Sequence, residues 1–341
     1  MDTEKPTASI NLKQIPANRR LVEELYAQGY LSAEGKVYAL NRLYPHNQWG
    51  IWVSRLLLLL GTALVLSGVV YFFAFNWAKL TPLIKFSTVQ IGLVSCLIAA
   101  YGYSLKKLAG QLFLLAATVL VGVFLAIFGQ IYQTGADAYQ LFMVWALLTF
   151  GWTVIASFSA QWLLWLIVSN IFIWLWWEQA ALPSSSMEDL LYSLLLGFNG
   201  LALVLREFTV QHNYNWLSAA WFRVMLVFVL AVFLIIPIEH CIIDPDSARV
   251  STYLSALLGS IILISGFWFY RFKLFDMWVL ATIVLTCCII AITAIFKLFF
   301  EIFGDSESIT FLLLGFATLG VFTVGLIYLR AVAHKMEAAH D

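Results

Sequence analysis

Ten long apolar runs separated by polar loops constrain this chain more than any other feature of its sequence. Most runs reach the roughly 20 residues that an α-helix needs to cross about 30 Å of hydrocarbon. Within a bilayer, backbone polar groups must be satisfied inside the spanning segment, as they are in a helix. The sequence therefore predicts an all-α integral membrane protein of about ten transmembrane helices, at about 51–75, 83–104, 108–128, 140–158, 161–177, 189–205, 216–238, 250–270, 277–296 and 309–329.

Composition supports this class. Hydrophobic residues make up 62% of the 341 positions and charged residues 11%, against roughly 45–50% and about 25% in soluble domains. A water-soluble fold of this size could not cover so much apolar surface, so the lipid bilayer is the expected partner. The chain has no basic segment interleaved with aromatic residues, and no nucleic-acid partner is predicted.

The loops alternate in charge, which predicts an orientation. If the amino terminus lies in the cytoplasm, 15 of the 19 Lys and Arg residues fall on the cytoplasmic side. The positive-inside rule therefore predicts that both termini are cytoplasmic, which requires an even number of spans. Acidic residues gather on the opposite side: Asp137, Glu178, Glu188, Asp189, Glu239, Asp244, Asp246, Glu301, Asp305 and Glu307.

The polar first fifty residues predict a small cytoplasmic helical hairpin. Its first helix runs from about Arg19 to Gln28 and ends at Gly29, a residue type that ends helices. Ser32 can cap the second helix, which ends before Pro45. Two interpretations remain open: the hairpin packs on itself or on the membrane surface, or it docks a protein partner.

These patterns give four predicted segments. They are a flexible tail, the cytoplasmic hairpin, the transmembrane bundle and a cytoplasmic tail, at residues 1–16, 17–50, 51–329 and 330–341.

One polar constellation stands out at the non-cytoplasmic side. Thr118, Gly122 and Ala126 recur at four-residue intervals, a pattern that allows close helix approach. The same helical face continues into the polar segment 130–137, and the first span ends on the same side at 76–79. Amides at the membrane edge need protein partners, so we predict one polar cluster of Asn76, Trp77, Lys79, Gln130, Gln133, Thr134 and Asp137. It either holds helices together or binds a ligand or lipid headgroup.

Other polar and small residues within the spans predict helix contacts. Asn170 and Asn199 are expected to form hydrogen bonds between helices, with pore lining as the alternative. The small residues Ser255, Gly259, Gly315 and Gly320 are expected at close helix contacts. Arg223, near the end of its span, is expected to extend its charge toward water.

Helix-start signals occur in three loops. In the first, Thr81-Pro82 places a cap residue before a helix-opening proline. Asp244-Pro245 fits a cap residue followed by a helix-opening proline. Ser185 and Ser186 each have an acid three residues later, as in a capping box.

No catalytic residue, cofactor site or metal site is predicted. The five His residues are scattered without metal-ligand spacing. The sequence also lacks a nucleotide-binding loop and a recognisable nucleophile–base motif.

Three segments carry a family resemblance: GYLSAEGKVYAL, VVYFFAFNWAKL and GQIYQTGADAYQLFMVWALL. Together they resemble the bacterial membrane proteins grouped as domain of unknown function 2157, over roughly residues 15–180. The NW pair and GQIYQTGAD are the most specific parts. The resemblance implies a multi-pass protein of the bacterial cytoplasmic (inner) membrane and supplies no activity, cofactor or catalytic residue.

The sequence is compatible with three functions. The first is a non-enzymatic component that acts with partner proteins, through the hairpin or small-residue helix faces. The second is a transporter, channel or lipid-handling protein with a polar site at the outer ends of helices 1 and 3. The third, an intramembrane enzyme, has the least support, because Asp137 with Lys79 is more simply an ion pair.

Overall fold

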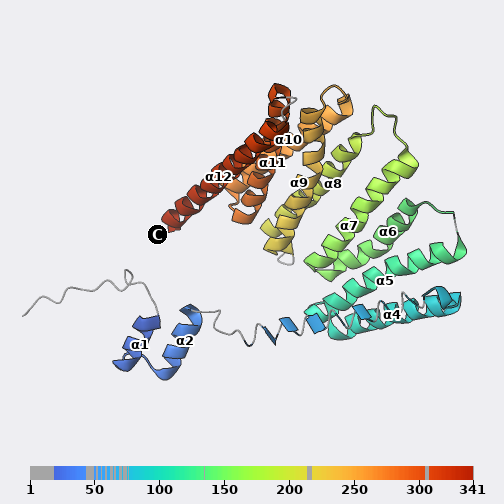
Figure 1. The fold of residues 1–341 in the computed structure, drawn as a ribbon. Helices are drawn as coiled ribbons and strands as arrows, with labels where there is room; N and C mark the ends of the chain where they lie inside the picture. Colours follow the sequence, from blue (N-terminus) through green and yellow to red (C-terminus); the bar gives the residue numbers. More distant parts are fainter. Residues whose placement is uncertain are drawn as a thin grey trace, which may run out of the picture. The chain divides into compact units, whose positions relative to one another are not determined.

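The structure, a computed structural model, describes residues 19–43, 77–133, 135–212, 217–303 and 307–340, with isolated positions between 50 and 75. The chain divides into two units, Met1–Leu80 and Thr81–Asp341. All regular structure within these ranges is helical (Figure 1), which confirms the predicted fold class.

The amino-terminal unit contains the two predicted short helices, α1 (Arg19–Ala27) and α2 (Ala33–Leu43). Gly29 lies in the turn after α1 and has φ +79°, a left-handed conformation that glycine adopts without strain. The Ser32 hydroxyl oxygen accepts the Gly35 N–H at 3.0 Å, as a helix-capping serine does. The prediction of two helices separated at Gly29 is confirmed. A short 3₁₀ turn, η2 (Trp77–Lys79), ends this unit.

Nine helices in the described part of the second unit are long and apolar enough to cross a membrane. They coincide with nine of the ten predicted runs. Of the predicted span 51–75 only isolated positions are described, so the count of ten stays a prediction. The nine are α4 (Pro82–Tyr103), α5 (Leu108–Tyr132), α6 (Ala138–Ala156), α7 (Ser159–Trp176), α8 (Leu190–Gln211), α9 (Ala220–Ile243), α10 (Val250–Trp268), α11 (Met277–Phe303) and α12 (Glu307–His340).

Two of these helices continue as π-helical segments. They are η3 (Trp177–Ala181) after α7 and η5 (Phe269–Lys273) after α10. Such segments are rare and frequently occur at functional sites.

Successive helices of the second unit run in opposite directions and pack as a series (Figure 1). α4 to α7 follow one another, α8, α10 and α11 all pack on α9, and α12 packs on α11 at the far edge. The basic end of this bundle carries Lys106, Lys107, Arg206, Arg223, Arg271 and Lys273. The acidic end carries Asp137, Glu178, Glu188, Asp189, Asp244 and Asp246.

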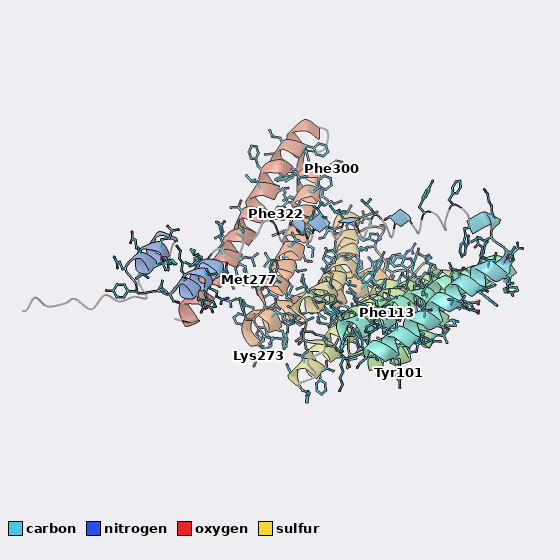
Figure 2. The ribbon with its side chains drawn as sticks, turned by 90° about the horizontal axis from the view of Figure 1, so that it is seen from below. Tyr101, Phe113, Lys273, Met277, Phe300 and Phe322 are labelled. Carbon is cyan, nitrogen blue, oxygen red and sulfur yellow. The ribbon has the colours of Figure 1, made fainter. Side chains whose placement is uncertain are left out.

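Large apolar side chains cover the outside of the bundle. Tyr101 is 91% exposed, and Phe300 and Phe322 also lie on the surface (Figure 2). A surface of this kind is stable in hydrocarbon and not in water. The chain is a multi-pass membrane protein.

Of the three predicted helix starts, that at Thr81-Pro82 is confirmed, since Thr81 directly precedes α4 and Pro82 is its first residue. The other two are wrong. Asp244 ends α9 instead of opening α10, and residues 244–249 form the connecting loop, in which the Ser247 hydroxyl donates to the Asp244 carbonyl at 3.3 Å. Ser185 and Ser186 lie in the turn before α8. Asp189 is the residue directly before that helix, and its carboxylate accepts a hydrogen bond from Thr252 of α10. A contact between helices has replaced local capping at this loop.

Small residues mark close helix contacts at some of the predicted positions. A Cβ on Gly259 would stand 2.9 Å from Cβ of Leu234, and Ser255 is fully buried, so both predictions are confirmed. For Gly315 and Gly320 the prediction is wrong within the described ranges, where no atom lies within 4 Å of the place of a Cβ. The contact between α11 and α12 is made at Gly325 instead, beside Cys288.

A buried amide joins three helices of the bundle. Gln161 is fully buried, and its Nε2 donates to Thr118 Oγ1 of α5 at 2.7 Å and to Thr153 Oγ1 of α6 at 3.4 Å. Gln161 Oε1 has no hydrogen-bond partner among the described residues. An orphaned buried acceptor destabilises the folded state by about 1–3 kcal/mol.

We therefore expect Gln161→Met to change the free energy of unfolding by less than about 1 kcal/mol, or to raise it. Methionine fills a similar volume, and both threonine hydroxyls keep their own acceptors, the carbonyls of Leu114 and Thr149. Unfolding in mixed SDS and dodecylmaltoside micelles measures the change. A loss above about 2 kcal/mol would show that the amide oxygen is engaged after all.

Candidate functional site

The predicted polar cluster is spread over parts of the chain that the structure describes separately. Asn76 and Thr134 lie outside the described residues. Trp77 and Lys79 belong to the amino-terminal unit, and Gln130, Gln133 and Asp137 to the unit 81–341. Their predicted association stays a prediction.

Within their own units these residues have local roles. Gln133 ends α5 in a left-handed conformation with φ +43°. Asp137 is the residue before α6 and is exposed. The Lys79 ammonium lies 5.7 Å from the centroid of the Phe75 ring, a cation–π contact.

The helix face of α5 that was predicted to continue into the polar segment 130–137 is only partly buried. Thr118 and Gly122 are buried against α6, and a Cβ on Gly122 would stand 2.5 Å from the Trp145 ring. Further along, Ala126 and Gln130 are exposed in the second unit taken by itself.

The second unit contains a buried group of charges that the sequence did not predict. We call it the ionic cluster, and it consists of Arg206 and Glu207 of α8, Arg223 of α9, Tyr270 of η5 and Asp276 in the loop before α11. The Arg206 side chain is 1% exposed and that of Glu207 9%. Two cations and two anions balance one another, which is the condition for keeping charges out of water.

Glu207 stands at the centre of the ionic cluster. Its Oε1 accepts hydrogen bonds from Arg206 Nη1 at 2.7 Å, Arg223 Nε at 2.9 Å and the Tyr270 hydroxyl at 3.0 Å. Its Oε2 accepts from Arg223 Nη2 at 3.3 Å. The carboxylate thus joins α8, α9 and η5.

The ionic cluster also fastens the connections at the basic end. Arg223 Nη1 donates to Asp276 Oδ2 at 2.6 Å. Asp276 Oδ1 in turn accepts the backbone N–H groups of Trp278 and Val279, in the manner of a helix cap. Arg206 Nε donates to the Leu217 carbonyl at 3.0 Å, which fixes the segment before α9.

The expectation that Arg223 extends toward water is wrong. Its side chain is 13% exposed and is paired with Glu207 and Asp276. From the sequence alone, Arg206 and Arg223 resemble the ordinary positive charges found at the ends of membrane spans. The available signal was the Arg206-Glu207 pair inside the last turns of an apolar run, since opposite charges at such a position can be buried together.

An apolar groove lies next to the ionic cluster, between α8 and α10. This α8–α10 groove has a volume of about 610 Å³, within the roughly 300–1,000 Å³ of small-molecule sites. Gly197 and Gly200 of α8 line it, and nothing in the described chain lies within 4 Å of the place of a Cβ on either. Absent side chains therefore create the space.

The two ends of the α8–α10 groove differ. Leu196 and Ile262 line it within the membrane span. At the basic end it is lined by Glu207, Tyr270 and Trp268. The Lys273 ammonium lies 5.8 Å from the centroid of the Trp268 ring, so a cation stands at this rim.

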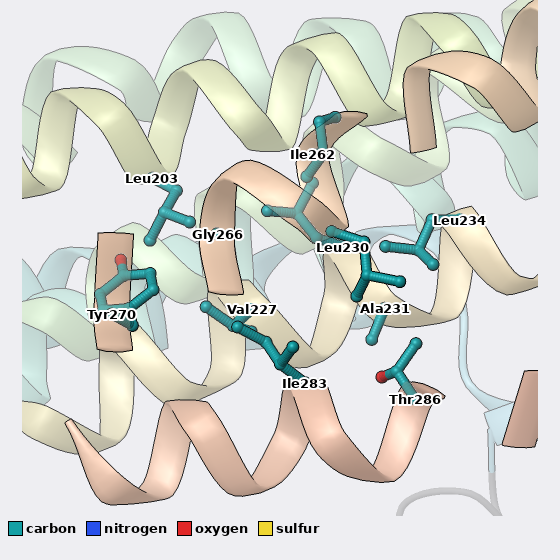
Figure 3. Close-up of a pocket in the computed structure, with 11 residues that line it drawn as sticks. Leu203, Val227, Leu230, Ala231, Leu234, Ile262, Gly266, Tyr270, Ile283 and Thr286 are labelled. Atoms are coloured by element: carbon teal, nitrogen blue, oxygen red, sulfur yellow. The ribbon is translucent and has the colours of Figure 1, made fainter. Parts of the chain in front are cut away.

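Behind the groove, a small cavity lies among residues of α9, α10 and α11 (Figure 3). Its volume is about 30 Å³, and Tyr270 and Thr286 are its polar lining residues. A space of this size holds about one water molecule. The described residues behind the groove are therefore closely packed, and in this part of the chain the groove lies at the surface.

The α7–α8 contact carries a reciprocal pair of amides. Asn170 Nδ2 donates to Asn199 Oδ1 at 3.1 Å, and Asn199 Nδ2 donates to Asn170 Oδ1 at 2.7 Å. The predicted hydrogen bond between helices is confirmed. Over the described ranges no three His, Cys, Asp or Glu side chains gather as metal ligands.

Comparison with known proteins gives one similarity. Residues 23–162 match the family described as predicted membrane protein (DUF2157). The resemblance stated from sequence is confirmed over that range, which contains α5 and α6 but neither the ionic cluster nor the α8–α10 groove. No curated protein and no solved structure matches the chain.

Proposed function

We propose that this multi-pass membrane protein is a non-enzymatic lipid-handling component that binds an anionic lipid in the α8–α10 groove. The observation that carries the proposal is an open apolar groove of about 610 Å³ whose basic end adjoins charged residues. A lipid has the matching form, since its acyl chain is apolar and its headgroup stays at the membrane surface.

Charge at the rim determines the kind of headgroup. Glu207 borders the groove, but its charge is compensated by Arg206 and Arg223. Lys273 beside Trp268 and Arg271 on the same π-helical segment then leave the rim positive. Each Lys or Arg near the surface attracts an anionic lipid by about 1 kcal/mol.

Lipid retention tests this proposal. The purified protein is exchanged into micelles with equal amounts of phosphatidylglycerol and phosphatidylcholine, and native mass spectrometry counts the retained lipids. We expect preferential retention of phosphatidylglycerol. Gly200→Phe fills the groove and should weaken that retention at least about tenfold, a change of about 1.4 kcal/mol.

The matched control is Gly151→Phe, because Gly151 lies on the exposed surface of α6 with no atom within 4 Å of its Cβ place in the described chain. Lys273→Ala should reduce the preference for phosphatidylglycerol about fivefold while leaving total lipid binding. Equal retention by the wild type, Gly200→Phe and Gly151→Phe would overturn the proposal.

In this proposal the basic end faces the cytoplasm of a bacterial cytoplasmic membrane, and both termini are cytoplasmic. The excess of Lys and Arg at that end supports this orientation. We expect Asp246→Cys to react with a membrane-impermeant maleimide in intact spheroplasts, in a background without Cys96, Cys241, Cys287 and Cys288. Lys106→Cys should react only after the membrane is permeabilised. The reverse pattern would contradict the orientation.

A second candidate function is docking of a protein partner through α1 and α2. It is supported by aromatic side chains on the surface of this unit, with Tyr30 77% and Tyr38 75% exposed. Crosslinking in native membranes would compare the wild type with Tyr30→Ser/Tyr38→Ser, using Glu34→Ser as the control. A partner whose crosslink is lost only in the tyrosine variant supports docking, and an unchanged pattern contradicts it.

A further inference from the structure

The basic end of the α8–α10 groove offers hydrogen-bonding groups as well as charge. The residues of one face of α8 line the groove at helical spacing: Gly197, Gly200, Val204, Glu207 and Gln211. Gln211 lies one turn, about 6 Å, beyond Glu207 toward the basic end. The lining contributed by α8 therefore changes from apolar to polar along one face of the helix.

Gln211 is available to a bound molecule. Its side chain is exposed and lines the groove. An amide offers two N–H donors and an oxygen acceptor. The neighbouring Glu207 carboxylate is already engaged by hydrogen bonds from the other members of the ionic cluster. Gln211 is thus the polar side chain of α8 that can exchange hydrogen bonds with a headgroup in the groove.

His212 follows Gln211 and has a fixed orientation. Its Nδ1 lies 2.8 Å from the Phe208 carbonyl oxygen. A carbonyl oxygen only accepts hydrogen bonds, so Nδ1 carries the hydrogen, and in the neutral ring Nε2 is an acceptor. The His212 ring also packs on the ring of Phe208, which lines the groove, with centroids 4.2 Å apart. Nε2 therefore provides an acceptor next to the groove.

These groups select a headgroup that contains more than a phosphate. The oxygens of a phosphodiester only accept hydrogen bonds, so they suit the Lys273 ammonium on the η5 side of the groove. A hydroxyl group both donates and accepts. It can donate to His212 Nε2 or Gln211 Oε1 and accept from Gln211 Nε2. The basic end of the groove therefore matches a headgroup that carries hydroxyl groups next to its phosphate.

We infer that the α8–α10 groove selects an anionic lipid whose headgroup carries free hydroxyl groups, with Gln211 and His212 as the specificity-determining residues. The headgroup phosphate pairs with Lys273, and the hydroxyl groups exchange hydrogen bonds with Gln211 and His212. Phosphatidylglycerol belongs to this class. The inference rests on the proposed function, because it specifies which anionic lipid the same groove binds.

Phosphatidylmethanol is the discriminating probe, because it has the charge of phosphatidylglycerol and lacks the hydroxyl groups. The full chain is placed in micelles with equal amounts of phosphatidylglycerol, phosphatidylmethanol and phosphatidylcholine of identical acyl chains. The buffer has about pH 8, where histidine is ordinarily neutral. Native mass spectrometry counts the retained lipids. We expect phosphatidylglycerol to be retained about two- to tenfold more than phosphatidylmethanol, the effect of one net hydrogen bond, and both to exceed phosphatidylcholine.

Gln211→Leu/His212→Phe should bring the ratio of retained phosphatidylglycerol to phosphatidylmethanol to about one. Both anionic lipids should remain above phosphatidylcholine, because the cation at the rim is unchanged. The matched control is Gln90→Leu/His240→Phe, which removes an exposed amide of α4 and a partly buried imidazole of α9 that do not line the groove. This control should keep the ratio of the wild type.

The outcomes separate this inference from the proposed function. Equal retention of phosphatidylglycerol and phosphatidylmethanol by the wild type would overturn the inference and leave the proposed function standing. An unchanged ratio in Gln211→Leu/His212→Phe would do the same. If neither anionic lipid exceeded phosphatidylcholine in the wild type, the proposed function would fail and the inference with it.

Discussion

Glu207→Leu is expected to lower the free energy of unfolding by about 3–5 kcal/mol. The substitution removes the acceptor shared by Arg206, Arg223 and Tyr270. It leaves the Arg206 guanidinium, 1% exposed, without its ion-pair partner. An uncompensated buried charge is among the most destabilising changes a fold can undergo. Unfolding of purified protein in mixed SDS and dodecylmaltoside micelles measures the loss.

Two comparisons isolate the burial of this charge. Glu188→Leu breaks an exposed pair with Arg249 and should lower the free energy of unfolding by at most about 1 kcal/mol. Adding Arg206→Met to Glu207→Leu should restore part of the stability, because it removes one of the unpaired cations. If Glu207→Leu proved no more harmful than Glu188→Leu, the ionic cluster would not be closed to water.

Gly122→Ala should lower the free energy of unfolding by about 1–3 kcal/mol, the usual effect of overpacking a core. The new Cβ would stand 2.5 Å from the Trp145 ring. That ring cannot move freely, because Trp145 Nε1 donates to the Thr118 carbonyl at 2.8 Å. The backbones of α5 and α6 must therefore separate, or the hydrogen bond must break. The same micellar unfolding measures the change.

The same helix offers the control. Gly129→Ala meets no atom within 4 Å in the described chain, so it should be neutral or stabilise the helix by up to about 1 kcal/mol. Trp145→Leu removes the obstructing ring, and in that background Gly122→Ala should lose most of its effect. Additive effects of Gly122→Ala and Trp145→Leu would contradict the contact between these residues.

The length and apolar character of the runs were sufficient to predict nine described helices and their order. A helix that crosses lipid must satisfy its own backbone, so its extent depends on local sequence alone. Gly122 and Gly259 were predictable for a related reason, since a small residue within a span has few functions other than close packing. Gly315 and Gly320 show the limit of that argument, because a glycine also occurs where nothing packs.

The candidate sites depended on information that the sequence does not hold. Glu207 and Asp276 are 69 positions apart in the sequence. Only the packing of the helices around α9 brings both of them to Arg223. The exposure of Ala126 depends on how α5 is rotated, which spacing alone does not fix. The α8–α10 groove depends on which space the side chains of neighbouring helices leave unfilled.

The ionic cluster has a consequence for how the chain enters the membrane. α8 carries Arg206 and Glu207 near its end, and α9 brings Arg223 after a short connection. A single helix with a charge in contact with lipid is disfavoured, and more so the deeper the charge lies. Glu207 of α8 is an ion-pair partner for Arg223 of α9, and Asp276 completes the charge balance of the four side chains once α10 has followed. We therefore expect this half of the protein to enter the membrane more readily as a group of helices than one helix at a time.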